Sequence, residues 1–266
     1  MIATPPRSLI FESGVGGLSV LAEVHRHLPW CEFVYACDNR AFPYGTKPEA
    51  DLVNRVEQVL KALIANTAPD IVVIACNTAS TVALPHIRAH FSNPVVGVVP
   101  AIKPAAALSR SGTIGLLATP GTIERAYTQQ LIDDFASHCS LVRIGSARLV
   151  EIAEAKLRRQ PIDRAELTDI LAPFFANHAL DTVVLACTHF PLLLEEFTAI
   201  APRPLTWIDS GEAIARRVAS FTGTRDSCHT PALTFNCWLT TDNDTTTALR
   251  NGLRHFGATT IANLDI

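Results

Sequence analysis

The sequence lacks several features that mark large functional classes. It has no run of basic residues and no basic stretch interleaved with aromatics, and its 22 lysines and arginines are matched by 25 acidic residues. Nothing therefore favours binding to the phosphate backbone of a nucleic acid, and a small molecule is the expected partner. The 7 cysteines include no CxxC spacing, which predicts reduced thiols rather than a disulfide framework.

Long apolar segments are absent as well. No apolar run approaches the length that spans a membrane, and residues 1–8 carry no cationic, apolar leader. We therefore expect a cytoplasmic protein that does not require a membrane. With 266 residues and 48% hydrophobic content, the chain is long enough for one large domain or two small domains with packed cores.

The chain does contain an internal repeat. The segment DIVVIACNT at 70–78 returns as DTVVLACTH at 181–189, and segments 9–14 and 96–100 match 115–120 and 206–210 in the same order. Recurring strand-and-loop units predict two similar α/β halves related by an approximate twofold axis. In such a fold, Cys76 and Cys187 would face each other across a cleft.

Strand-like and helix-like patterns alternate along the chain, which predicts parallel sheets with right-handed crossovers. The polar segment 222–231 reads as a connector, and the tail beyond 256 carries little signal. Strands are expected near 8–11, 32–36, 70–75, 94–99, 113–118, 141–144, 182–186, 205–209 and 234–239. Helices are expected near 18–27, 48–66, 81–91, 123–138, 147–158, 164–178, 211–221 and 246–256.

Cys76 and Cys187 each follow a short, β-branched apolar run that is typical of a buried parallel strand. Open α/β sheets bind ligands at the carboxyl ends of such strands. Buried free cysteine is common, so either thiol alone would be read as structural, but the repetition favours chemistry. The other cysteines lack this context and are expected to be packing or surface thiols: Cys31, Cys37, Cys139, Cys228 and Cys237.

A glycine-rich loop at 14–17 follows the first expected strand, yet the full dinucleotide fingerprint and the Walker pattern are both absent. The glycines are expected to let backbone N–H groups, Glu12 and Ser13 approach a compact anionic ligand. Glu12 could instead be a helix-cap or surface carboxylate. The loop 38–47 has turn formers around a tyrosine, and by itself it is read as an ordinary surface turn.

Two other uses of these thiols compete with a facing pair. Cys76, Cys187 and His189 have side chains that zinc prefers, but no second ligand lies near Cys76 in the sequence. A hydrolase with Cys187 as nucleophile and His189 as base is also conceivable, but it leaves the matching Cys76 unexplained.

These residues are the ones that carry a family resemblance. The segments 12–20, 38–45, 75–80 and 186–192 resemble the glutamate racemases, within the cofactor-independent aspartate/glutamate racemase family. The likeness runs in order from the first strand to about Phe221. Segment 145–156 resembles the proteobacterial type, which implies activation by a nucleotide-linked cell-wall precursor.

The resemblance implies a fold of two parallel-sheet α/β domains, with the active site in the cleft between them. The first domain would comprise 1–99 plus 211–266, and the second 100–210. It further implies interconversion of L- and D-glutamate for peptidoglycan synthesis, without pyridoxal phosphate or metal. A homodimer is compatible with it, although nothing in the sequence sets the oligomeric state.

In this family one cysteine thiolate removes the α-proton while the other, as a thiol, donates a proton to the opposite face. By that analogy Cys76 acts on the D-enantiomer and Cys187 on the L-enantiomer, with His189 assisting Cys187. A free thiol has a pKa of roughly 8.5, which helix N-termini and polar neighbours can lower. The resemblance assigns substrate contacts to Glu12, Ser13, Pro43, Tyr44, Gly45, Asn77, Thr78, Thr119, Thr188 and His189, and extends to Asp38 and Glu151.

One position departs from the family pattern, because the family has aspartate where this chain has Glu12. The extra methylene moves the carboxylate by about a bond length, which in a preorganised site can reduce the rate by ~10²-fold. Two alternatives stay open at this point. One is a racemase of aspartate or another α-substituted acid, and the other is an amino-acid-binding or regulatory protein with activity reduced by Glu12.

Overall fold

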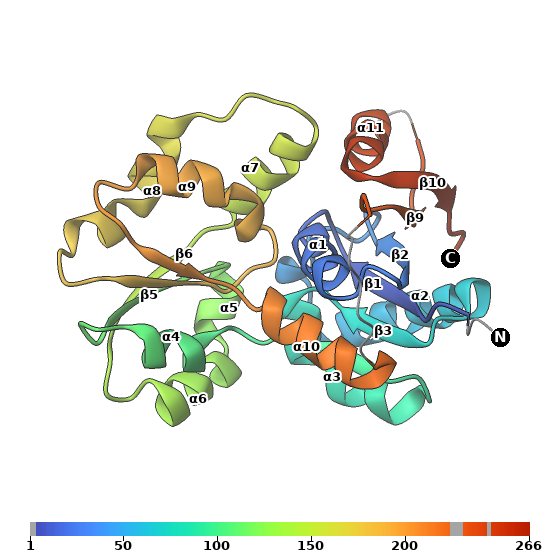
Figure 1. The fold of residues 1–266 in the computed structure, drawn as a ribbon, viewed down its shortest axis with the longest axis horizontal. Helices are drawn as coiled ribbons and strands as arrows, with labels where there is room; N and C mark the ends of the chain where they lie inside the picture. The colour runs from blue at the N-terminus through green and yellow to red at the C-terminus, as the bar shows by residue number, and fades with distance from the viewer. Residues whose placement is uncertain (1–3, 224–230, 244–245) are drawn as a thin grey trace.

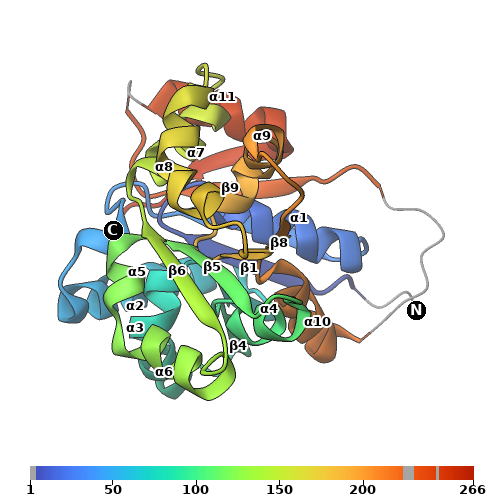
Figure 2. The ribbon, with the colours of Figure 1, turned by 90° about the vertical axis from the view of Figure 1, so that its left-hand side faces the viewer.

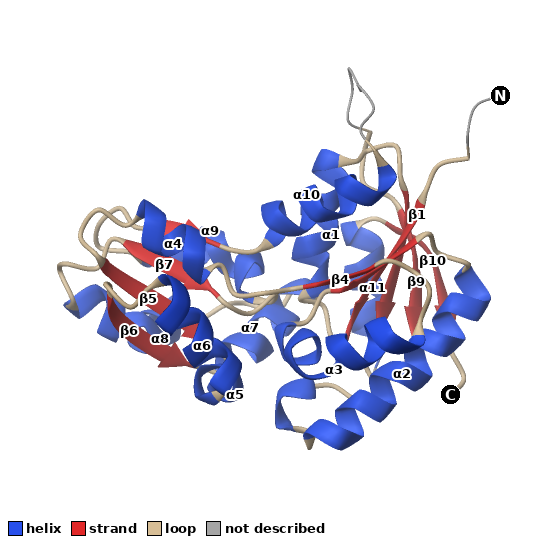
Figure 3. Ribbon diagram, turned by 90° about the horizontal axis from the view of Figure 1, so that it is seen from below, coloured by secondary structure: helices blue, strands red, loops and turns tan. Residues whose placement is uncertain are grey.

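The computed structural model describes residues 4–223, 231–243 and 246–266. Within these residues the chain forms two separate parallel sheets, one of six strands and one of four, which lie in different lobes of the molecule (Figures 1 and 3). The six-stranded sheet has the order β10-β9-β2-β1-β3-β4, and the four-stranded sheet has the order β6-β5-β7-β8. The predicted α/β class with two parallel sheets is confirmed.

The six-stranded sheet is covered by helices on both faces, which explains why its central strands are apolar throughout. Helices α1, α10 and α11 pack on one face, and α2 and α3 on the other. The strands are β1 (Arg7–Glu12), β2 (Glu32–Cys37), β3 (Ile71–Ile74), β4 (Val95–Gly97), β9 (Phe235–Leu239) and β10 (Ala258–Asn263). The helices are α1 (Gly17–His27), α2 (Glu49–Thr67), α3 (Asn77–His90), α10 (Gly211–Thr222) and α11 (Thr247–Phe256).

The four-stranded sheet is also covered on both faces, by α7, α8 and α9 on one side and by α4 and α6 on the other (Figure 2). Its strands are β5 (Thr113–Ala118), β6 (Ser140–Gly145), β7 (Thr182–Leu185) and β8 (Thr206–Ile208). Its helices are α4 (Ile102–Leu108), α5 (Pro120–Glu124), α6 (Ala126–Phe135), α7 (Arg148–Leu157), α8 (Arg164–Ala176) and α9 (Leu194–Ile200). Short 3-10 helices span Tyr44–Thr46 and Phe190–Leu193.

The strand order repeats between the two halves. The run β2-β1-β3-β4 in one sheet corresponds to β6-β5-β7-β8 in the other, so β3 and β7 occupy equivalent central positions. These are the strands that lead into Cys76 and Cys187. The internal repeat in the sequence is thus a repeat of sheet topology.

Several boundaries differ from the sequence expectations. The helix expected at 123–138 is two helices, α5 and α6, because Arg125 between them has extended backbone. Helix α3 starts at Asn77 rather than at 81, because the polar residues after Cys76 form its first turn instead of a loop. Helices α4 and α9 and strand β10 had no counterpart in the prediction. β10 lies at the sheet edge and has only one buried residue, so it has no apolar pattern to detect.

The C-terminal strands β9 and β10 return to the six-stranded sheet beside β2. The division at 1–99 plus 211–266 and 100–210 stays a prediction of domain boundaries. Most of the expected connector at 222–231 lies outside the described residues. In the part of the chain that the structure describes, no helix has the length and apolar character needed to cross a membrane.

Candidate active site

A cavity of about 260 Å³ lies where the two halves meet. Residues at or within two positions of the carboxyl ends of four central strands line it: Glu12 at β1, Cys76 after β3, Thr119 after β5 and Cys187 after β7. Parallel α/β sheets bind ligands at this end of their strands. The repeated topology therefore brings both cysteines to one cavity.

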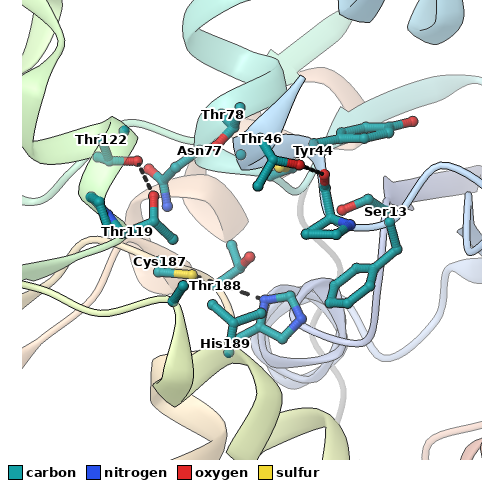
Figure 4. A pocket seen from close by; sticks show the side chains of 18 of the residues that line it. Ser13, Tyr44, Thr46, Asn77, Thr78, Thr119, Thr122, Cys187, Thr188 and His189 are labelled. Atoms are coloured by element: carbon teal, nitrogen blue, oxygen red, sulfur yellow. Dashed lines mark hydrogen bonds between the residues drawn. The ribbon is translucent and has the colours of Figure 1, made fainter. Parts of the chain in front are cut away.

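Most of the residues singled out in the sequence line this cavity (Figure 4). They are Glu12, Ser13, Pro43, Tyr44, Gly45, Cys76, Asn77, Thr78, Thr119, Glu151, Cys187, Thr188 and His189. The lining also includes residues that sequence reasoning missed: Phe42, Thr46, Pro120, Gly121, Thr122, Ala147, Val150 and Ala186. Thr122 belongs to the polar wall, because its hydroxyl lies 2.9 Å from the hydroxyl of Thr119.

Asp38 does not line the cavity. Its carboxylate is fully buried beneath the loop after β2, where it accepts hydrogen bonds from Tyr44, from Thr240 and from two nitrogens of Arg55. Burial alone would raise the pKa of Asp38, but these partners lower it below its usual value. The Tyr44 hydroxyl is therefore directed at Asp38, and the tyrosine contributes its ring to the cavity wall.

Cys76 stands at the N-cap of α3 and is nearly buried. Burial raises the pKa of this thiol well above its ordinary value, and the negative charge of Glu12 raises it further, while the backbone N–H of Ala79 in the first helical turn acts in the opposite direction. The surroundings of Cys76 thus favour the protonated thiol.

Cys187 is equally buried but has a different neighbour. Its sulfur lies 3.9 Å from Nδ1 of His189, which begins the 3-10 helix Phe190–Leu193 (Figure 4). Burial by itself disfavours an imidazolium, yet the pKa of His189 is raised well above its usual value by the charge of Glu12 and by hydrogen bonds with Cys187 and Glu154. Cys187 therefore faces a positively charged ring.

Glu154 is a further buried acid that sequence reasoning missed. It is 3% exposed, and its Oε1 lies 3.1 Å from Nε2 of His189 and accepts a 2.8 Å hydrogen bond from the backbone N–H of Val15. The available signal was helical spacing, because Glu154 lies one turn after the buried Val150 and so falls on the buried face of α7.

The glycine loop at 14–17 differs from the expectation that its backbone N–H groups approach an anionic ligand. The N–H groups of Gly14 and Gly16 donate to Glu12 Oε2 at 2.9 and 3.1 Å, so the loop binds a carboxylate of its own chain. A Cβ at Gly14 would collide with Glu154 and Phe42, and one at Gly16 with His189 and Thr188. Glycine is needed at both positions because these side chains approach the loop so closely.

Asn77 provides an unsatisfied group in the wall. Its side-chain Oδ1 is buried and has no hydrogen-bond partner among the described residues, although Asn77 lines the cavity at the first turn of α3. A buried amide oxygen without a partner carries a free-energy cost that a donor from a ligand would remove. The site therefore offers an acceptor suited to an ammonium group.

Charge in the wall is carried by few groups. The lining residues include the carboxylates Glu12 and Glu151 and the His189 ring, and none of the described lining residues is lysine or arginine. An anionic ligand would therefore be held by hydroxyl groups and by N–H groups at the start of α3, because both nitrogens of His189 already face Cys187 and Glu154. Within residues 4–223, 231–243 and 246–266, no three histidine, cysteine, aspartate or glutamate side chains are grouped so that they could hold a metal ion.

Known racemases share the sequence pattern of this chain. The sequence profile of the Asp/Glu/hydantoin racemase family matches residues 18–218. Glutamate racemase of Klebsiella pneumoniae is 53% identical over 224 residues, which is 82% of this chain and 79% of that protein. Glutamate racemase of Photorhabdus laumondii is 54% identical over 218 residues, covering 82% and 76% of the two chains.

Solved structures agree with the sequence comparison. The Escherichia coli glutamate racemase in complex with L-glutamate and the activator UDP-MurNAc-Ala superposes with a TM-score of 0.91 at 45% identity, covering 98% of both chains. The Thermus thermophilus glutamate racemase in complex with β-chloro-D-alanine gives a TM-score of 0.75 at 27% identity, covering 99% of this chain and 98% of the other.

Proposed function

The chain belongs to the Asp/Glu/hydantoin racemase family, and we propose that it interconverts L- and D-glutamate by moving the α-proton between Cys76 and Cys187. The observation that carries this proposal is the pair of cysteines at equivalent strand ends, both lining one cavity. A racemase must remove a proton from one face of Cα and return one to the opposite face. Two thiols delivered by the two halves of a repeated fold meet that requirement.

The reaction is difficult because an α-C–H beside a carboxylate is a very weak acid. The site must hold a base in line with that proton and oppose the build-up of negative charge. Cys187 acts as the thiolate base on L-glutamate while Cys76 donates its proton, and the roles reverse for D-glutamate. The thiol-favouring surroundings of Cys76 and the imidazolium beside Cys187 suit the L-to-D direction of this exchange.

The remaining lining residues hold the substrate. Asn77 accepts a hydrogen bond from the α-ammonium group through its unpartnered Oδ1, and Glu12 supplies opposite charge. The α- and side-chain carboxylates bind hydroxyl groups and backbone N–H groups, because the described wall of the cavity has no lysine or arginine. The hydroxyls are those of Ser13, Thr78, Thr119 and Thr188, and Pro43, Tyr44 and Gly45 close the wall.

The cellular role follows from the product. D-glutamate is supplied for peptidoglycan synthesis, whose precursors are assembled in the cytoplasm, and we place the enzyme there. The Escherichia coli racemase was solved with the activator UDP-MurNAc-Ala. We extend activation by such a nucleotide-linked precursor to this chain on the strength of 45% identity over nearly its full length. Homodimer formation is proposed from the family resemblance alone.

Circular dichroism of L- and of D-glutamate solutions with purified, metal-stripped protein tests the proposal. Both solutions should lose optical activity without added cofactor, and product formed in D₂O should carry deuterium at Cα. Aspartate in place of glutamate should turn over far more slowly. Turnover that requires pyridoxal phosphate, or that a chelator abolishes, would exclude the two-thiol mechanism.

A further inference from the structure

Strand β2 directs two buried side chains at the backbone of the glycine loop. The hydroxyl of Tyr35 donates a 2.6 Å hydrogen bond to the carbonyl of Gly14, and the thiol of Cys37 donates to the carbonyl of Ser13 at 3.4 Å. Both side chains are buried, and the ring of Tyr35 packs edge-on against Phe235 with the ring centroids 6.0 Å apart. The core of the six-stranded half therefore holds the Tyr35 hydroxyl in a fixed place beneath the loop.

The peptide unit that Tyr35 holds has its other end in the active-site region. In a trans peptide the C=O and N–H groups point in opposite directions, so the Gly14 carbonyl and the Val15 N–H are the two ends of one planar unit. The Val15 N–H donates a 2.8 Å hydrogen bond to Oε1 of Glu154, and the same oxygen lies 3.1 Å from Nε2 of His189. A donor on the carbonyl thus fixes the direction of this N–H.

Glycine makes such a donor necessary. Gly14 has no Cβ to restrict the rotation of the peptide that follows it, and a Cβ there would collide with Glu154 and Phe42. The orientation of the peptide must therefore come from its hydrogen bonds. Burial raises the pKa of Tyr35 well above its ordinary value, and the negative charge of Glu12 raises it further, so the hydroxyl stays a donor.

We propose that Tyr35 is a positioning residue for the racemisation, which sets the geometry of the Cys187 side through the peptide 14–15. Hydrogen bonds run from Tyr35 through this peptide to Glu154. From Glu154 they continue to His189, whose Nδ1 lies 3.9 Å from the sulfur of Cys187. Tyr35 does not line the cavity, so it acts through the peptide and not on substrate. This inference rests on the proposed function and deepens it.

The Cys76 side is held by other peptide units. Glu12, the charged neighbour of Cys76, accepts hydrogen bonds from the N–H groups of Gly14 and Gly16. Neither N–H belongs to the peptide unit whose carbonyl Tyr35 holds. Loss of the Tyr35 hydroxyl should therefore affect one cysteine more than the other.

Racemisation rates cannot separate the two sides. L- and D-glutamate have equal free energies in solution, so kcat/KM must be equal in the two directions for any variant. Elimination from glutamate carrying chloride at Cβ is irreversible and escapes this constraint. The cysteine sulfur takes the α-proton, the C–H electron pair forms the Cα=Cβ double bond, and chloride leaves with the C–Cl pair.

The experiment compares Tyr35→Phe with the wild type on the L- and D-forms of 3-chloroglutamate. Phenylalanine keeps the ring and its packing and removes only the hydroxyl, so the fold should persist. Elimination from the L-form, which uses Cys187 as base, should fall by about tenfold, because small displacements that begin far from the chemistry can cost up to ~10²-fold. Elimination from the D-form should change by less than about threefold.

Two controls separate this role from loop stability and from the substitution itself. Cys37→Ala removes the neighbouring buried donor to the same loop and should leave elimination from the L-form within about threefold of the wild-type rate. Tyr127→Phe makes the same change at an exposed position on α6 and should leave both eliminations near the wild-type rate.

A Tyr35→Phe variant that loses both eliminations equally, or neither, would overturn the inference. A Cys37→Ala variant that loses elimination from the L-form as strongly as Tyr35→Phe would also overturn it, because loop stability would then be the cause. Wild-type protein that does not racemise glutamate would instead refute the proposed function, so the two failures can be told apart.

Amide hydrogen exchange, followed by NMR, reports on the peptide itself. In Tyr35→Phe the amide of Val15 should exchange about tenfold faster than in the wild type, because its hydrogen bond to Glu154 is no longer held in place. The amide of Gly16, which donates to Glu12, should change by less than about threefold. An unchanged exchange rate of Val15 in a folded Tyr35→Phe protein would contradict the proposed role.

Discussion

The two cysteine loops occupy equivalent places in the repeated fold but differ in the structure that comes directly after the cysteine. After β3, Cys76 caps the 14-residue helix α3, whereas after β7, Cys187 leads into a 3-10 helix that His189 caps. The strand topology that positions the two cysteines is repeated, but the charged side chain beside each cysteine differs. Glu12 is the charged neighbour of Cys76, and His189 is the charged neighbour of Cys187.

This difference has a chemical reason. A two-thiol racemase needs one thiolate and one thiol at the same time, and identical surroundings would give both sulfurs the same proton affinity. A carboxylate stabilises a neighbouring thiol, whereas an imidazolium stabilises a neighbouring thiolate. Glu12 beside Cys76 and His189 beside Cys187 therefore prepare the two sulfurs for proton transfer. Substitutions can test the surroundings of each cysteine separately.

The largest effect should come from removing either sulfur. Cys76→Ser and Cys187→Ser should each reduce racemisation by about 10³-fold or more, because a hydroxyl cannot replace a thiolate base. 3-Chloroglutamate carries chloride at Cβ, so removal of its α-proton by one cysteine is enough for chloride to leave. Cys76→Ser should therefore retain this elimination from the L-form, and Cys187→Ser should retain it from the D-form. If either variant eliminates chloride from both enantiomers equally well, the sulfurs do not act on opposite faces.

The next largest effect should come from removing the histidine, which should slow elimination from one enantiomer and not from the other. His189→Asn should lower elimination from L-3-chloroglutamate by about 10²-fold, because Cys187 loses the imidazolium beside it. Elimination from the D-form should fall by less than about threefold. His178→Asn is the matched control, since His178 lies in the same half away from the cavity. Equal loss with both enantiomers would mean that His189 supports the whole cavity and not Cys187 alone.

The parts of the site that the sequence predicted are those encoded in short segments. Both cysteines and their polar neighbours come after recognisable strands, so the repeat was enough to predict their meeting in one cavity. Glu154 was missed because its contacts are with His189 and Val15, which lie 35 and 139 positions away in the chain. The buried position of Asp38 was not predicted either, because Arg55 and Thr240, which donate hydrogen bonds to its carboxylate, come from distant segments of the chain.

The loops after β2 and β6 also occupy equivalent places in the two sheets, and their contributions to stability can be compared. Asp38, after β2, has a buried network with Arg55 on α2, whereas Ser146, after β6, accepts a hydrogen bond from the N–H of Leu149. Asp38→Asn should lower the free energy of unfolding by about 3 kcal/mol, because it leaves Arg55 without its charge partner. Ser146→Ala should cost about 1 kcal/mol. Urea denaturation measures both, and equal losses would contradict the contrast.

The Asp38 contribution should also depend on pH. Its pKa is depressed in the folded protein, so the stabilisation is present above the unfolded value of about 4 and is lost as pH falls through the folded value. The difference in unfolding free energy between wild type and Asp38→Asn should therefore shrink below about pH 4. A difference that stays constant down to the acid limit of folding would show that the charge of Asp38 is not its source.

The smallest effect tests the carboxylate beside Cys76. Burial is the first cause of its raised thiol pKa, and the Glu12 charge is the next. Removing that charge in Glu12→Gln should lower the pKa of Cys76, moving the midpoint of its alkylation by iodoacetamide to lower pH by about one unit. Glu12→Asp keeps the charge and should leave the midpoint nearly in place. Peptide mapping by mass spectrometry isolates Cys76 from the other thiols. A midpoint that moves equally in both variants would assign the effect to loop geometry, and the two halves would then differ by the histidine alone.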